Sequence, residues 1–103
     1  MWRFEIAPRV DAYLDDFQKE PLVMAVHIAI VGLAFSDDGL PSEGEVEDCG
    51  DGYHRWLVHH HTLILQIIES DIQGYQQTDI LYIADSEIRS EEETKKIIAS
   101  LTE

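Results

Sequence analysis

The stretch that most constrains this chain covers residues 53–69, YHRWLVHHHTLILQIIE. It predicts two adjacent β-strands, with the three histidines at positions 59–61 in the turn between them. In its second half, Leu63, Leu65 and Ile67 alternate with a mixed set of residues, which is the period-2 pattern of a strand with one side on a core. Residues 78–84, TDILYIA, have similar β-branched and aromatic character and can pair with this stretch. The three runs together predict an antiparallel meander.

The other segments predict one further strand and three helices. Residues 2–6 alternate in polarity, as a strand does, and apolar positions at helical spacing predict an amphipathic helix over residues 10–17. Residues 22–35 are almost entirely apolar, and Pro21 before them favours a helix over a central strand. This segment is shorter than the roughly 20 residues that span a bilayer. Ser90 followed by Glu93 is a capping box, which predicts a C-terminal helix.

The predicted fold is therefore a single α+β domain over residues 1–103. Its order is an N-terminal strand, a two-helix hairpin, an antiparallel meander of three or four strands, and a C-terminal helix. The helix over residues 22–35 is apolar on nearly every side, whereas one small sheet covers only one stripe of a helix. We therefore expect a homodimer or an obligate heterocomplex, with this helix at the contact.

The charge of the chain restricts its partners. Acidic residues number 21 and basic residues 7, for a formal net charge of −14. Such a chain repels nucleic acid and anionic membranes and favours basic partners. Solubility or salt adaptation, a basic partner, and mimicry of a polyanion all explain this charge. The acids are densest in residues 36–52, predicted to be a loop in which positions 45–49 can add a short edge strand.

The histidines raise a metal hypothesis, because neutral imidazole is a common ligand of transition metals. In an extended strand, His59 and His61 project to one side and His60 to the other, so at most two or three ligands can converge with His54 or an acid from the loop. The spacing matches no strong zinc pattern. A solvated hairpin turn is the preferred interpretation, with His59 and His61 as the alternative metal ligands, and we expect no cofactor.

Three other side chains are candidates for a role. His27 lies on the apolar helix and is interpreted as a core histidine or one that faces a dimer partner. Trp56 either packs under a helix, which we prefer, or lines a ligand surface with Arg55. Cys49 is the lone cysteine, and its acidic neighbours disfavour the thiolate, so we expect no nucleophile there. One cysteine fits a reducing cytoplasm, and the start of the chain lacks the apolar core of a signal peptide.

Three segments carry a resemblance to a known family. They are residues 2–8, WRFEIAP, residues 51–56, DGYHRW, and residues 63–67, LILQI. In this order the segments resemble the RelE/ParE superfamily of toxins from bacterial type II toxin–antitoxin modules. The resemblance extends over residues 1–85. It implies the order of elements given above, and in ribosome-dependent members it implies cleavage of messenger RNA by side chains that include phosphate-holding arginines and lysines.

The sequence departs from the family where that chemistry is carried out. Arg55 is the one arginine of the central motif that is present, and Leu57 and Thr62 stand where further arginines are usual. Residues 84–88, ADSEI, are acidic where the family is basic. Phosphoryl transfer without positive charge lacks its main means of stabilising the transition state. We therefore expect the nuclease chemistry to be absent, with Arg55 as the one candidate catalytic residue.

Two hypotheses of function follow. The first is a RelE/ParE-like protein that binds a protein partner, either a cognate antitoxin or another basic segment, through Arg55, Trp56 and His27. The second is an acidic inhibitor that mimics nucleic acid and occupies a basic site on another protein. Both place the protein in the cytoplasm, and neither involves direct binding of nucleic acid or membrane.

Overall fold

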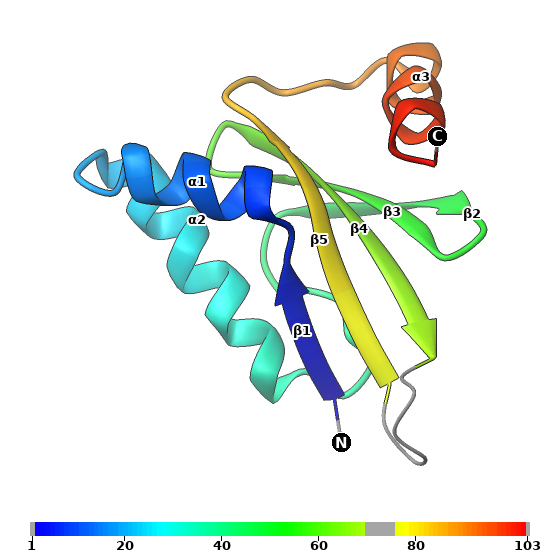
Figure 1. The fold of residues 1–103 in the computed structure, drawn as a ribbon, viewed down its shortest axis with the longest axis horizontal. Helices are drawn as coiled ribbons and strands as arrows, with labels where there is room; N and C mark the ends of the chain where they lie inside the picture. The colour runs from blue at the N-terminus through cyan, green and yellow to red at the C-terminus, as the bar shows by residue number, and fades with distance from the viewer. Residues whose placement is uncertain (1, 70–75, 103) are drawn as a thin grey trace.

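A computed structural model of the protein describes residues 2–69 and 76–102 and has a mixed α+β architecture (Figure 1). The helices are α1 (Pro8–Asp16), α2 (Pro21–Val31) and α3 (Glu91–Leu101), and one turn of 3-10 helix, η1 (Gly32–Phe35), follows α2. The strands are β1 (Trp2–Ile6), β2 (Glu45–Gly50), β3 (Tyr53–Val58), β4 (His61–Glu69) and β5 (Gln76–Ala84). The predicted α+β class is confirmed.

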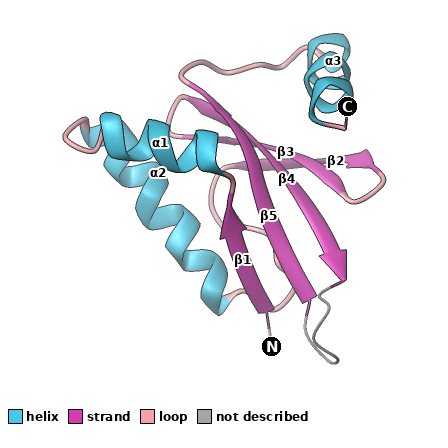
Figure 2. Cartoon of the chain, in the orientation of Figure 1, coloured by secondary structure: helices cyan, strands magenta, loops and turns pink. Residues whose placement is uncertain are grey.

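The strands form one sheet in the order β1-β5-β4-β3-β2, drawn in magenta in Figure 2. The pairs β2–β3, β3–β4 and β4–β5 are antiparallel, whereas β1 lies parallel to β5. The histidine run lies at a turn, as predicted, although His61 already belongs to β4. His59 and His60 form the two-residue connection with φ values of 47° and 63°. Two successive positive φ values are those of the tight turn whose twist suits a hairpin.

The main core lies between one face of the sheet and the helices α1 and α2. Leu63 and Leu65 are fully buried there, as their alternation predicts, while Ile67 is half-buried. Trp56 on β3 is also fully buried in this core. The helices supply a matching set of buried apolar side chains, namely Val10, Leu14, Val23, Val26, Ala29 and Ile30.

The apolar segment 22–35 was predicted as one helix, and this prediction is wrong at its end. The α-helix ends at Val31, and η1 completes the segment. The inward face of α2 is buried, but the opposite face is not covered by any element in the described part of the chain, so large apolar side chains stand exposed there. The apolar surface therefore exceeds what the sheet covers, as the sequence predicts.

Helix α3 lies on the other face of the sheet. Arg55 neighbours the inward-pointing Trp56 on β3 and so points away from the core, and there it contacts Thr94 of α3. The predicted N-cap at Ser90 is confirmed, because the Ser90 side chain accepts a hydrogen bond of 3.2 Å from the Glu93 backbone, which is one of the two bonds of a capping box. The chain before α3 is tied to β4 by Thr62, whose hydroxyl donates to the Ser86 carbonyl at 2.6 Å.

Within the residues that the structure describes, no helix is both long and apolar enough to cross a membrane.

Candidate partner-binding site

Arg55 connects three elements rather than facing solvent. Its guanidinium forms an ion pair with Glu47 of β2, and Nη1 donates to the Arg89 carbonyl at 2.9 Å and to the Thr94 hydroxyl at 3.3 Å. The residue is 9% exposed, and among the described residues its Nε has no hydrogen-bond partner. A guanidinium engaged in this way holds α3 on the sheet and presents little charge to a phosphate or to a partner.

A small cavity of about 110 Å³ lies beside Arg55, and Cys49 lines it together with Lys95 of α3. Burial raises the pKa of the Cys49 thiol, the charges of Glu47 and Asp48 raise it further, and Arg55 acts in the opposite direction. The raised pKa favours the protonated thiol over the thiolate. The main cause of the raised pKa is burial, whereas the sequence suggested repulsion by acidic neighbours.

The histidines diverge instead of converging on one point. His59 Nε2 faces the Glu43 carboxylate at 3.2 Å. His61 is buried, its Nδ1 lies 2.8 Å from the His59 carbonyl, and its Nε2 lies 3.1 Å from the Tyr13 hydroxyl. Because a carbonyl only accepts, Nδ1 is the donor, and a neutral His61 then accepts from Tyr13. Across residues 2–69 and 76–102, no group of three or more potential ligands is placed to hold a metal ion.

The three residues predicted to contact a partner lie in different surroundings. Trp56 is fully buried and its Nε1 donates to the Glu43 carbonyl at 2.8 Å, so it packs in the core under the helices, which is the preferred interpretation. Arg55 is committed to the contacts described above. His27 is exposed on α2, which excludes the interpretation as a core histidine and leaves it available for a partner.

The outward face of α2 and η1 carries an apolar stripe that we call the α2 stripe: Met24, Ile28, Val31 and Phe35. These side chains are 51%, 67%, 46% and 87% exposed. Met24, Ile28 and Val31 are spaced by four and three residues, which places them along one side of α2, and Phe35 follows them in η1. No charged residue occurs in residues 21–36. Such a contiguous exposed apolar surface usually marks an interaction site.

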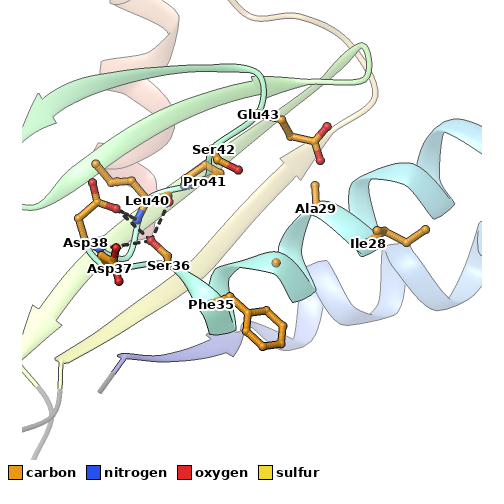
Figure 3. A pocket seen from close by; sticks show the side chains of 11 residues that line it. Ile28, Ala29, Phe35, Ser36, Asp37, Asp38, Leu40, Pro41, Ser42 and Glu43 are labelled. Atoms are coloured by element: carbon orange, nitrogen blue, oxygen red, sulfur yellow. Dashed lines mark hydrogen bonds between the residues drawn. The ribbon is translucent and has the colours of Figure 1, made fainter.

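Two hollows flank the α2 stripe. The larger, of about 510 Å³, lies between Ile28, Ala29 and Phe35 on one side and the loop of residues 36–43 on the other (Figure 3). The second, of about 350 Å³, is lined by Leu14 and by residues near the start of α2 that include Met24 and His27. Ile28 lines both hollows, so it stands as a ridge between two recesses.

The rim of the larger hollow is negative. Asp37, Asp38 and Glu43 line it, and all three are exposed. The Asp38 carboxylate accepts hydrogen bonds from the Leu40 backbone at 3.0 Å and from the Ser36 hydroxyl at 2.9 Å, and these bonds lower the pKa of Asp38. Asp38 therefore stays ionised well below neutral pH. The site combines an apolar floor with fixed negative charge along one edge.

Sequence reasoning identified the helix of this site, His27 within it and the acidic loop after it, but it identified neither the stripe nor the position of the loop beside it. The spacing of Met24, Ile28, Val31 and Phe35 was the available signal, and it was hidden because apolar residues fill the other face of α2 as well. Comparisons of the chain with protein-family models, curated proteins and solved structures found no match.

Proposed function

We propose that this chain is a RelE/ParE-like protein of a toxin–antitoxin module that acts by binding a protein partner through the α2 stripe. The observation that carries the proposal is the exposure of that stripe, in which Ile28 and Phe35 are 67% and 87% exposed. Leaving such surface in water is unfavourable by about 25 cal/mol per Å². A partner that covers the stripe removes this cost, and the partner is a cognate antitoxin or another basic protein segment.

The order of elements supports the family assignment. A first strand, two helices, a set of antiparallel strands and a last helix follow one another as the resemblance implies. The same proposal holds that ribonuclease activity is lost. Leu57 and Thr62 are 4% and 0% exposed, Arg55 is engaged with Glu47, and the segment after β5 is acidic. These positions therefore supply no cluster of free positive charge for a phosphate.

A nucleic-acid mimic is the second candidate, and the same ion pairs count against it. Glu47 pairs with Arg55, and Glu45 pairs with Arg89 at 2.9 Å. Carboxylates that are neutralised by cationic neighbours are poor substitutes for a regular row of phosphates. The acidic residues in the first turn of α3 belong to a separate element from these carboxylates.

Co-expression with the product of a neighbouring small reading frame tests the binding function. We expect a stable complex that survives gel filtration, with no cleavage of ribosome-bound message by the purified chain. Cleavage at catalytic concentrations would contradict the proposal if Arg55→Ala abolished it while the exposed control Arg89→Ala did not. Circular dichroism of both variants shows whether each remains folded, so a loss of activity is not mistaken for a loss of structure.

A further inference from the structure

We propose that the occupant of the α2 stripe is a single amphipathic helix that carries lysine or arginine beside its apolar residues. This inference rests on the proposed function, because it specifies the partner of the same surface. Within α2 the stripe is spaced by four and three residues, which is the spacing at which one helix packs its side chains between those of another. A facing helix can place an apolar side chain into each hollow, one on either side of Ile28.

The charge of the partner follows from the rim. Asp37, Asp38 and Glu43 border the larger hollow, and Glu20 immediately precedes α2, whereas α2 and η1 themselves are uncharged. A helix lying along the stripe therefore has an apolar centre against it and carboxylates beside its edge. Basic residues at that edge form favourable pairs, and acidic residues there are repelled, so the rim selects for positive charge.

The same charges disfavour a second copy of this chain. Each copy has a formal net charge of −14, and packing α2 against α2 brings the acidic rims of both copies to one interface. A basic helix gains the same apolar contact without this repulsion. We therefore assign the stripe to a different protein rather than to a homodimer.

Selection from a displayed library of randomised 20-residue helical peptides tests this assignment. We expect the enriched peptides to be net positive, with apolar residues at helical spacing, and to bind more weakly as salt is added. Ile28→Ser should weaken their binding roughly tenfold or more, as loss of a central anchor does. Because Ile28 is 67% exposed, this variant should melt at nearly the same temperature as the original chain.

Two sets of charge variants distinguish the effect of the acidic rim on binding from the effect of the total charge of the chain. The rim variant Asp37→Asn, Asp38→Asn, Glu43→Gln should weaken binding and flatten its salt dependence. Asparagine keeps the oxygen that the Leu40 backbone bonds, so the loop is preserved. The matched control removes three acids on other elements and should leave binding nearly unchanged: Glu5→Gln, Glu92→Gln, Glu93→Gln.

Several results would overturn the inference. Enrichment of neutral or acidic peptides, no enrichment at all, or equal effects of the rim and control variants would each do so. Sedimentation that shows a dimer of the chain alone, dissociated by Ile28→Ser, would assign the stripe to a second copy. If Ile28→Ser weakens the binding of a neighbouring gene product but the rim variant does not, this inference fails while the proposed function stands. If basic helices bind the stripe but no such gene product binds the chain, the proposed function fails instead.

Discussion

Arg55 was a candidate for catalysis or partner binding, and in the structure it connects elements of the fold. Its charge is removed from water at a point where β2, β3 and α3 meet, and a buried cation is tolerated only when it is paired and hydrogen-bonded. Glu47 supplies the charge, and the Arg89 carbonyl and the Thr94 hydroxyl supply acceptors. The stability of α3 on the sheet therefore depends on a carboxylate of the edge strand.

Replacing Glu47 by glutamine should lower the free energy of unfolding by about 1–2 kcal/mol, because Arg55 then stays buried without an opposite charge. Urea denaturation at neutral pH measures this change. Glu45→Gln is the matched control, since it removes an exposed pair with Arg89 and should cost less than about 0.5 kcal/mol. Equal effects of the two substitutions would mean that Arg55 does not need its partner.

Cys49 should react slowly with iodoacetamide in the folded protein and faster once the chain is unfolded. Burial raises the pKa of its thiol in the fold above the unfolded value of about 8.5. The folded state therefore holds the thiol proton to higher pH than the unfolded state does, and stability falls as the pH rises above that value. Mass spectrometry of the alkylated chain gives the rates.

The matched control for Cys49 is Cys49→Ser, which does not titrate in this range and should lose less stability between pH 8 and pH 10. An alkylation rate that is the same in folded and unfolded protein would show that the thiol is free and unperturbed.

At the scale of elements, two histidines form the β3–β4 turn in a backbone conformation that favours glycine. His59 and His60 both have positive φ, which is unfavourable for residues other than glycine and asparagine. His60→Gly should therefore stabilise the fold by about 0.5–1 kcal/mol, measured by thermal melting, since glycine removes the strain at some cost in unfolded-state entropy. His60→Ala is the control at this exposed position: it keeps a Cβ at positive φ, so the strain remains and the melting temperature should change little. A lower melting temperature for His60→Gly would show that the imidazole makes a contact of its own.

Local patterns predicted most elements of this fold, but not how the distant ones meet. The alternation of Leu63 and Leu65 and the Ser90 cap depend on neighbouring residues, and both are found as predicted. The parallel pairing of β1 with β5 joins segments far apart in the chain, and no local pattern specifies it. The exposure of His27 and the burial of Arg55 likewise depend on which face a distant element covers.

At the scale of the whole molecule, the net charge of −14 should make the fold sensitive to salt. Self-repulsion weakens a compact state, and salt at 0.1 M limits its reach to about 10 Å. The melting temperature should therefore rise with added sodium chloride, most steeply at low concentration. A variant that removes exposed acids of α1 should melt higher in low salt and respond less to added salt: Asp11→Asn, Asp15→Asn, Asp16→Asn. A melting temperature that falls with salt would show that attractive pairs outweigh the repulsion.

The pairing of β1 with β5 also sets the order of events during synthesis on a ribosome. β1 emerges early, but the strand whose backbone it bonds emerges only after α1, α2 and three other strands. The Ala7 amide donates to the Ile80 carbonyl at 2.8 Å, so this hydrogen bond also cannot form until β5 has been made. Contacts between such distant segments form slowly. Until β5 has been made, a growing chain therefore carries β1 without its partner strand and an apolar surface on α2, and such exposed surfaces favour aggregation.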